Sequence, residues 1–329
     1  MQDVQAMMGG GPTLQFATYR FVLKALEPIH LPPNAGSTFR GGFGGSFRRA
    51  VCFQRNRPEG SCNGCTVQHS CPYGYIFETR LPPGSEVLKS LKEIPHPFVL
   101  EPPMSPPAES SAGERICFRV VLIGGAIAFL PYFAVAFFDL GRRGIGRGRG
   151  RFLLEGIEAE HPLNGRTEQI YREGSLFSCS TDLTATYSDL ASMCEGMSPR
   201  RITVHLLTPT RLISGERPAT EPTFAVLVRA AMRRISALSY FHCGKRWVAD
   251  FAGIAAAAEG VGLISSDLRW EEWERYSSRQ DARMRMGGLV GSATYEGELG
   301  PYLPLLLSAG VVHVGKACTF GNGRMRVDW

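Results

Sequence analysis

Lysine is scarce in this sequence. Only five of its 36 basic residues are lysine, at positions 24, 89, 92, 245 and 316, so the other 31 (36 minus 5) are arginine. Arginine carries a planar fork of donors that matches phosphate groups and base edges, whereas lysine is a hydrated point charge. A lysine-based surface for a polyanion is therefore excluded. The formal net charge of +6 allows an arginine-based one, and the alternative is a genome that favours arginine throughout.

A secretory signal is also lacking, because residues 1–12 have no charged segment followed by an apolar core. We expect a cytoplasmic protein in a reducing compartment, where structural disulfides are rare. One stretch, 120–138, has no charged side chain and is nearly long enough to span a bilayer. Gly124, Gly125 and Pro131 interrupt it, so we expect a strand followed by a buried helix and no membrane association.

An internal repeat predicts two similar domains. Residues 130–152 and 303–325 align without a gap at an offset of 173 (303 minus 130). Each segment opens with Leu-Pro, continues as an apolar helix, passes through a loop rich in glycine and basic residues, and ends in a strand. Solenoid repeats have shorter periods, and 329 residues suffice for two separate cores.

The remaining hydrophobic patterns place a β-α-β-β-α-β order in both halves, which is that of a ferredoxin-like domain. The first half has expected strands at 14–25, 97–101, 115–123 and from 151, with helices at 38–52 and 126–140. The second half has expected strands at 201–207, 268–273, 289–295 and 324–327, with helices at 222–240 and 302–312.

The predicted fold class is α+β, with two tandem ferredoxin-like (RRM-like) domains and a four-cysteine insertion in the first. The expected divisions are a flexible terminus (1–12), an amino-terminal domain (13–165), a linker (166–199) and a carboxyl-terminal domain (200–329).

The loop at 142–151 reads RRGIGRGRGR, which is five arginines among four glycines. Glycine lets backbone N–H groups approach an anion closely, and arginine adds bidentate contacts to phosphate. A solvated linker has a similar composition. However, the equivalent segment of the repeat, 315–323, is again rich in glycine and contains Lys316. The sequence therefore favours anion-binding loops in both domains.

Three motifs carry a family resemblance: GKACTFGNG at 315–323, GSTFRG at 36–41, and RYSSRQ at 275–280 followed by Gly287 and Gly288. With them the sequence resembles the CRISPR-associated endoribonucleases of the RAMP superfamily that process precursor RNA. Those proteins close a ferredoxin-like domain with a glycine-rich loop that holds a basic residue. The resemblance covers most of the chain.

The resemblance implies sequence-specific cleavage of CRISPR repeat RNA without a catalytic metal. A ribose 2′-OH would attack the adjacent phosphorus, leaving a 2′,3′-cyclic phosphate and a 5′-OH. Such a reaction needs a base, an acid and a cation for the phosphorane. The expected partners are repeat RNA or its processed guide, and other subunits of a CRISPR effector complex. The residues expected to bind RNA are Arg40, Arg143, Arg147, Arg149, Arg151, Lys245, Arg246, Arg275, Arg279, Lys316 and Arg324.

The catalytic residues are harder to assign. Many relatives place a histidine in the first helix, but that helix has none here, and Arg40 stands near the expected place. We rank His242 first, because Lys245 and Arg246 are close by, and His30 second, with Tyr276 as a partner. Histidine suits the reaction because its pKa lies near neutrality. For each histidine a hydrogen-bonded structural role is the alternative.

Four cysteines, Cys52, Cys62, Cys65 and Cys71, have the spacing C-x9-C-x2-C-x5-C. Four thiolates, two of them in a C-x2-C turn, can enclose a structural zinc ion. An iron–sulfur cluster or disulfides are the alternatives, and His69 could replace Cys52 as a ligand.

Two other functions fit the sequence. A RAMP subunit could hold guide RNA in an effector complex without cutting it, which the missing first-helix histidine favours. A protein whose cysteine cluster senses redox state or docks a partner is the other.

Overall fold

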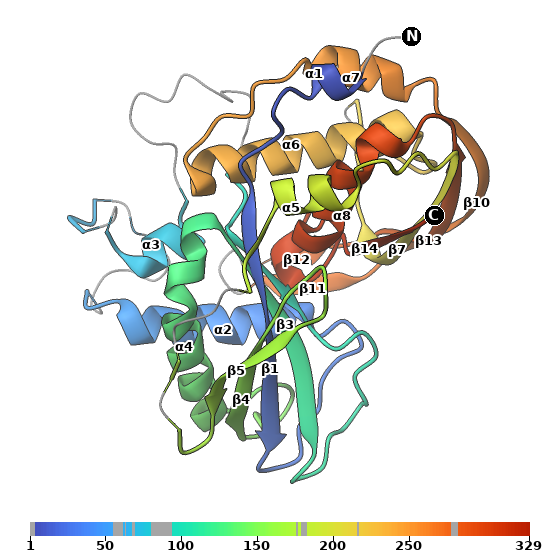
Figure 1. The fold of residues 1–329 in the computed structure, drawn as a ribbon. Coiled ribbons are helices and arrows are strands. Elements are labelled where there is room, and N and C mark those ends of the chain that lie inside the picture. Colours follow the sequence, from blue (N-terminus) through green and yellow to red (C-terminus); the bar gives the residue numbers. More distant parts are fainter. Residues whose placement is uncertain are drawn as a thin grey trace. The chain divides into compact units, whose positions relative to one another are not determined.

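The structure is a computed structural model, and it describes residues 4–54, 62, 64–67, 70–79, 94–175, 177–178, 183–215, 217–277 and 282–329. The chain forms two compact units. One consists of Ala17–Thr184, and the other combines Met1–Phe16 with Ala185–Trp329. We call them the first and the second unit and describe each by itself (Figure 1).

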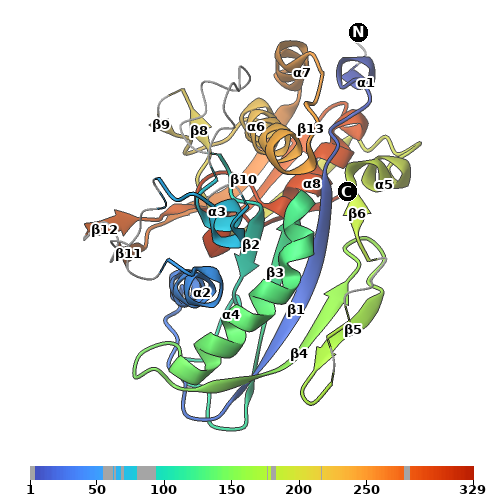
Figure 2. The ribbon, with the colours of Figure 1, turned by 90° about the vertical axis from the view of Figure 1, so that its left-hand side faces the viewer.

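The first unit is an antiparallel sheet with two helices packed together on one face. The sheet order is β2-β3-β1-β4-β5, and Figure 2 shows α4 lying across the sheet. Its elements are β1 (Gln15–Ala25), α2 (Gly36–Val51), α3 (Pro72–Phe77), β2 (Phe98–Glu101), β3 (Arg115–Ile123), η1 (Gly124–Phe129), α4 (Leu130–Arg143), β4 (Phe152–Glu160) and β5 (Thr167–Arg172).

The second unit repeats this arrangement. Its sheet order is β10-β13-β7-β14, and α6 packs against α8. The main elements are β7 (Arg201–Thr210), α6 (Phe224–Cys243), β10 (Gly262–Glu271), β13 (Gly288–Glu296), η2 (Gly300–Tyr302), α8 (Leu303–Val312), η3 (Cys318–Phe320) and β14 (Met325–Asp328). Added to them are α1 (Val4–Met7), β6 (Ala185–Thr186), α5 (Tyr187–Met193), β8 (Ile213–Ser214), β9 (Arg217–Pro218), α7 (Phe251–Ala258), β11 (Glu274–Ser277) and β12 (Ala282–Arg285).

The predicted pair of ferredoxin-like domains is confirmed. Written in order along the chain, the four main strands of both units have the spatial order 2-3-1-4. The repeat is exact in its elements as well: α4 and α8 begin at Leu130 and Leu303, and β4 and β14 begin at Phe152 and Met325, each pair 173 residues apart (303 minus 130, 325 minus 152).

Two of the expected divisions need correction. Residues 4–12 of the expected flexible terminus are packed, because α1 packs against α7, and Trp247 Nε1 donates a 2.9 Å hydrogen bond to the Met8 carbonyl. The described residues of the expected linker, 166–199, contain β5, β6 and α5. The last of these begins with a capping box between Thr186 and Asp189. These elements are short, so their hydrophobic periodicity is too brief to recognise in the sequence.

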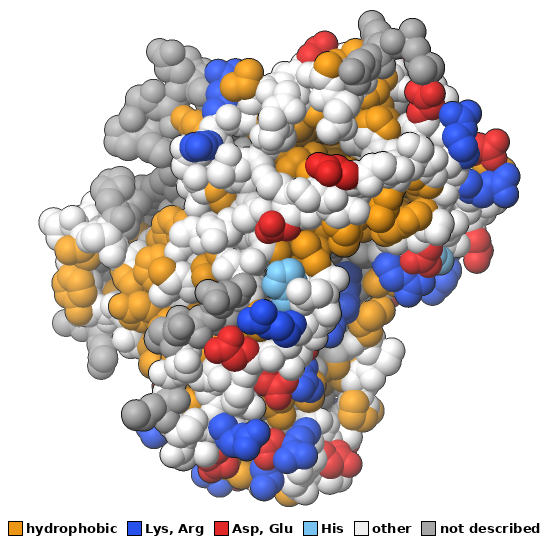
Figure 3. Space-filling model, in the orientation of Figure 1, with side chains coloured by type: hydrophobic (Ala, Val, Ile, Leu, Met, Phe, Trp, Pro, Cys, Tyr) orange, Lys and Arg blue, Asp and Glu red, His pale blue; other side chains and the backbone are white. Residues whose placement is uncertain are grey.

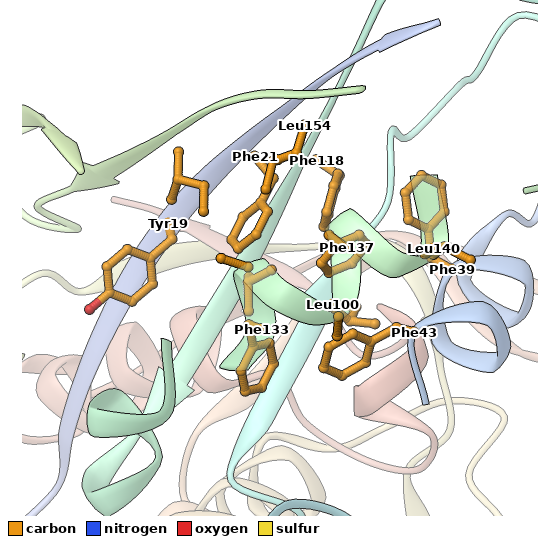
Figure 4. Close-up of a cluster of buried hydrophobic side chains, with 14 of the residues drawn as sticks. Tyr19, Phe21, Phe39, Phe43, Leu100, Phe118, Phe133, Phe137, Leu140 and Leu154 are labelled. Carbon is orange, nitrogen blue, oxygen red and sulfur yellow. The ribbon is translucent and has the colours of Figure 1, made fainter. Parts of the chain in front are cut away.

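The core of the first unit is a cluster of phenylalanine rings between the helices and the sheet (Figure 4). Phe39, Phe43 and Phe47 recur every four residues along α2, which places them on one face, and all three are fully buried. The ring of Phe43 stacks on Phe133 and Phe137 of α4, at centroid distances of 4.7 and 5.3 Å.

The apolar stretch that includes α4 is long and apolar enough to cross a membrane by composition, and half of it is buried within the structure. Phe133 and Phe137 lie inside the phenylalanine cluster. The expectation that this segment serves as a core helix is therefore met.

We expect Phe43→Ala to destabilise the protein by about 3–5 kcal/mol, because it leaves a cavity among five other phenylalanine rings. Urea unfolding of the full chain, followed by circular dichroism, measures the change. Val135→Ala is the matched control, since this residue is 49% exposed on α4 and should change stability by about 0.5 kcal/mol or less. Equal losses from the two substitutions would show that the ring cluster is not the centre of the core.

Candidate nucleic-acid interface

The arginine loop (residues 142–151) leaves α4 and enters β4 through a tight turn. Ile145 and Gly150 form a bridge, and Gly144, Gly146 and Gly148 have positive φ angles of 76–81°. A Cβ at Gly144 would lie 1.9 Å from the Arg149 carbonyl oxygen, so only glycine fits there. The loop therefore has a defined conformation, in contrast to a solvated linker.

Three exposed arginines project from this turn. Arg143, Arg147 and Arg149 form no ion pair with any carboxylate in the described part of the chain, and Arg149 itself has a positive φ of 54°. Arg151 differs, because its guanidinium and its backbone N–H bind the carboxylate of Glu27. This pairing lowers the pKa of Glu27 through the hydrogen bonds from Arg151. Four arginines of this loop are expected to bind RNA. Arg143, Arg147 and Arg149 have guanidinium donors available for it.

His30 lies against the same loop. Its carbonyl accepts a 3.0 Å hydrogen bond from the backbone N–H of Arg147. A Cβ at Gly146 would come within 2.2 Å of that carbonyl oxygen, so the two backbones are in close contact. The imidazole is 35% exposed, and its Nδ1 lies 3.7 Å from Oε2 of Glu109. The first unit thus brings an accessible histidine next to arginines without carboxylate partners.

The glycine-rich loop of the second unit (residues 315–323) is held by polar anchors below it. The fully buried His313 uses Nδ1 in a 2.9 Å hydrogen bond to the Asn322 carbonyl. Thr208 Oγ1 donates to the Gly321 carbonyl (2.8 Å) and accepts from the Arg324 N–H (2.9 Å). These contacts leave Lys316 exposed on the loop. His313 is therefore a structural anchor of this loop.

Arg275 reaches this loop from the β11–β12 hairpin. Its guanidinium lies 4.5 Å from the centre of the Phe320 ring, and burial lowers its pKa. The hairpin carries two more arginines that the sequence analysis did not select, Arg283 and Arg285. Both side chains are about four-fifths exposed. A guanidinium nitrogen of each lies 3.9 Å from a carboxylate oxygen of Glu274, which is a long distance for an ion pair. The sequence analysis missed these two arginines because the motif RYSSRQ does not reveal which strand pairs with it. The pairing of β11 with β12 is what places them on the same hairpin as Arg275.

The other candidate residues have different surroundings. His242 is in the last turn of α6 and is 7% exposed, while Lys245 and Arg246, just after the helix, are exposed. Arg40 lies over the ring of Phe77, 4.3 Å from its centre, so it is partly covered. Tyr276 belongs to β11, where its backbone pairs with Arg283.

The structure leaves two candidates undescribed. Arg279 and His69 both lie outside the described residues.

The four cysteines are half-buried free thiols. The Cys65 N–H donates to the Cys62 carbonyl (3.1 Å), and Cys71 precedes α3. Burial, followed by the nearby Glu78 and Cys71, raises the pKa of the Cys62 thiol. Within the described residues, no three His, Cys, Asp or Glu side chains are grouped closely enough to hold a metal. The zinc site stays a prediction.

Arg234, on α6, is a supporting residue that was not among the site residues expected from the sequence. Its Nε donates a 2.8 Å hydrogen bond to the Val312 carbonyl at the carboxyl end of α8, where a cation is favourable. It therefore stabilises the point at which α8 leads into the glycine-rich loop.

The open face of the first sheet, by contrast, is covered with paired charges. Arg119 Nε lies 2.6 Å from Glu160, and Arg20 and Arg115 pair with Glu158 and Glu155. Figure 3 shows blue and red side chains intermingled at the lower end of the view. A surface of matched charges gives little attraction to a polyanion.

Known families match both units. A family model described as CRISPR-associated endoribonuclease Cas6 matches residues 204–325, and the model AF_1859_N, described as an N-terminal domain, matches residues 14–182. The AF_1859_N match covers just over half of the sequence (169 of 329 residues), so the chain belongs to the family that this model describes, whereas the Cas6 match covers 122 residues of the second unit. The resemblance to RAMP endoribonucleases is confirmed, and the protein is an RNA-cleaving enzyme of the class that processes CRISPR repeat RNA.

Individual relatives are more distant. An uncharacterized protein of Archaeoglobus fulgidus is 26% identical over 306 residues, covering 91% of this chain and 93% of its own. Thermus thermophilus Cas6, solved free and as a product complex, has TM-scores of 0.53 and 0.54 at 16% and 15% identity. These comparisons cover 97% and 95% of this chain and 100% and 99% of theirs.

A partial Cas6-RT-Cas1–Cas2 complex has a TM-score of 0.57 at 13% identity, covering 98% of this chain and 47% of that one. At such identities the likeness of the solved structures shows the fold.

We expect Arg147→Ala, Arg149→Ala and Lys316→Ala each to weaken binding of repeat RNA. If these side chains contact phosphate, each loss should flatten the plot of log affinity against log salt by about 0.7 on single-stranded RNA. Filter binding over a range of salt concentrations measures both effects. Arg166→Ala is the control, because it removes an exposed arginine from the β4–β5 turn. Unchanged affinity in all three variants would make the loops purely structural.

Proposed function

We propose that this protein cuts CRISPR repeat RNA by transesterification, without a catalytic metal. The 2′-OH of one ribose attacks the adjacent phosphorus and the 5′ oxygen leaves, which yields a 2′,3′-cyclic phosphate and a 5′-OH. The observation that carries the proposal is the contact between His30 and the arginine loop, where Arg147 N–H donates to the His30 carbonyl. A proton-transfer group and cations for the phosphorane are adjacent there.

His30 is our candidate for the proton transfer. Its ring is accessible to RNA, and Glu109, 3.7 Å from Nδ1, would orient it. Either ring nitrogen can serve, since a single imidazole can accept the 2′-OH proton or protonate the leaving oxygen. A second group must then perform the other half of the reaction.

The arginine loop is our candidate for charge stabilisation. Arg147 and Arg149 are exposed and have no carboxylate partner among the described residues. Guanidinium groups bind phosphate oxygens through two parallel hydrogen bonds, and they keep their charge at every relevant pH. A dianionic phosphorane gains more from such donors than the starting diester does, which lowers the barrier.

His242 ranked first on sequence, and its burial now argues against it. A side chain that transfers a proton must come within hydrogen-bonding distance of the RNA, whereas His242 is 7% exposed in the last turn of α6. Tyr276 remains a candidate partner. We assign Lys245 and Arg246, both exposed, to RNA binding.

We further propose that the glycine-rich loop of the second unit binds the repeat RNA through Lys316, supported by the hairpin arginines. Solved relatives include a Cas6 product complex and a Cas6-RT-Cas1–Cas2 complex. These names support processed guide RNA and other CRISPR subunits as partners of this chain. The cytoplasm stays the proposed location.

Our proposal for the four cysteines is a structural zinc site. Its support is the donor set itself: four half-buried thiols, two in a C-x2-C turn, between α2 and α3. Cys52, Cys62, Cys65 and Cys71 would all be ligands, so the site would stabilise this segment and take no part in cleavage. An iron–sulfur cluster is the alternative that the same donors allow.

We expect His30→Ala to slow single-turnover cleavage of repeat RNA by about 10²–10⁴-fold, with RNA affinity nearly unchanged. His242→Ala, the comparison variant, should cut within a few-fold of the wild-type rate. Gel analysis gives the rates, and end-labelling of the upstream fragment identifies the cyclic phosphate. Wild-type cleavage should persist in EDTA at concentrations that leave the structural zinc bound.

The reverse result, a slow His242→Ala and a normal His30→Ala enzyme, would return the assignment to His242. If both variants cut normally, Arg40, Tyr276 and Lys316 become the residues to test. A wild-type protein that binds repeat RNA tightly and never cuts it would indicate a guide-holding subunit. The absence of a histidine from α2 favours that second candidate.

For the metal, we expect about one zinc per chain by elemental analysis. Cys65→Ser should lower the melting temperature and the zinc content, with little change in the cleavage rate. Cys117→Ser, at an exposed cysteine of β3, is the control and should leave both unchanged. A zinc-free protein, stoichiometric iron with sulfide, or a disulfide between Cys62 and Cys65 would refute this assignment.

A further inference from the structure

A small pocket lies within the first unit, between α2 and the arginine loop. Its volume is about 200 Å³, and it is lined by Gly41, Gly42, Gly45, Arg49, Leu140, Arg143, Gly144 and Arg149. Pockets for metabolites and cofactors usually measure about 300–1,000 Å³. This one is therefore suited to a small group, and three of its eight lining residues are arginines.

The floor of the pocket is a stripe of glycine on α2. Gly41, Gly45 and Arg49 follow one another at intervals of four residues, so they share one face, opposite the buried phenylalanines. A Cβ at Gly41 would meet no atom within 4 Å, and a Cβ at Gly45 would meet only Arg49, at 3.4 Å. Packing within the protein therefore does not explain these two glycines, although glycine weakens a helix interior.

The other two glycines have a packing reason. A Cβ at Gly42 would come within 2.9 Å of Leu140, and Gly144 touches the Arg149 backbone. They set the close approach of α2, α4 and the loop. This approach brings Arg143 and Arg149 from the loop side to Arg49 on the helix side.

The charges around the pocket are unequal. Arg49 donates to Asp139 (2.7 Å) and to Ser46 (2.8 Å), which fixes its guanidinium. Although burial acts to raise the pKa of Asp139, hydrogen bonds from Arg49 and Ser46 keep it below its usual value, so this carboxylate is ionised. Three arginines face one carboxylate. The charge of Arg143 also helps to lower the pKa of Asp139, but neither Arg143 nor Arg149 forms an ion pair with an acidic group among the described residues.

We infer that this pocket binds a backbone phosphate of the repeat RNA, a role not assigned above to Gly41, Gly45 or Arg49. The inference rests on the proposed function and deepens it. The bare helix surface at Gly41 and Gly45 lets the phosphate approach α2. Arg143 and Arg149 then bind its oxygens, while Arg49, held by Asp139, forms the far wall. The bound phosphate would fix the register of the strand on the first unit.

The test fills the pocket without changing its charge. Gly41→Ala adds one carbon and Gly41→Leu adds four, in a helix that tolerates both. We expect little effect of the first and about a 10-fold loss of affinity for single-stranded repeat RNA from the second, which removes charged hydrogen bonds. The slope of log affinity against log salt should fall by about 0.7 with Gly41→Leu. Thermal unfolding should show both variants at least as stable as the wild type.

A second experiment compares two substitutions that each remove one positive charge. Arg143→Ala should weaken binding clearly more than Arg142→Ala, which removes the neighbouring exposed arginine outside the pocket lining. The RNA carries hydroxyl groups at both ends, so only backbone phosphates are present. If Gly41→Leu weakened only an RNA with a terminal phosphate, the pocket would bind chain ends and the inference would be wrong.

Wild-type cleavage of the same RNA separates the two proposals. Normal wild-type binding and cleavage, with Gly41→Leu indistinguishable from it, would overturn the pocket assignment alone. A wild-type protein that neither binds nor cuts the repeat RNA would overturn the proposed function, and the pocket assignment with it.

Discussion

The close approach of two backbones at the end of α4 is the constraint on which the first unit's candidate site depends. Gly146 lies against the His30 carbonyl, where a Cβ would come within 2.2 Å, and Gly144 lies against the Arg149 carbonyl. Any other residue at these positions would push the loop away from the segment after β1 that carries His30. Because the glycines allow the contact, a histidine and three arginines more than a hundred residues apart in sequence become neighbours.

The same constraint explains why the duplication could be recognised from the sequence. In both units a helix opened by Leu-Pro must turn through a fixed number of residues into the fourth strand, so Gly148 and Gly321 both have φ near 80°. Insertions there would break the turn. The offset of 173 residues is therefore preserved at the start of each helix and each strand. The two domains and most of their elements followed from this spacing and from hydrophobic periodicity.

What the sequence did not predict depends on contacts between distant residues. Arg151 pairs with Glu27 and Arg40 lies on Phe77, yet nothing local distinguishes them from Arg147 or Arg149. The burial of His242 has the same origin, since it depends on how α6 packs. Strand β10 begins six residues before its expected start, because most of its side chains are exposed and show no alternation. The pocket beside α2 combines a helix face and a loop about a hundred residues later.

The scarcity of lysine allowed two interpretations, a genomic bias or a phosphate-binding surface. The ion pairs of the arginines help to decide between them, because paired and unpaired arginines lie in different parts of the first unit. On the open face of the first sheet, Arg20, Arg115 and Arg119 are matched by glutamates, so there arginine acts as a structural cation. Around the turn after α4, Arg143, Arg147 and Arg149 lack such partners among the described residues. Genomic bias would explain arginine in both places, but it does not explain why the three arginines after α4 form no ion pairs with carboxylates of the described residues while those on the open face do. Clustered guanidinium groups repel one another, so leaving them unmatched costs stability unless an anion binds. The unmatched arginines are therefore the ones that we assign to RNA.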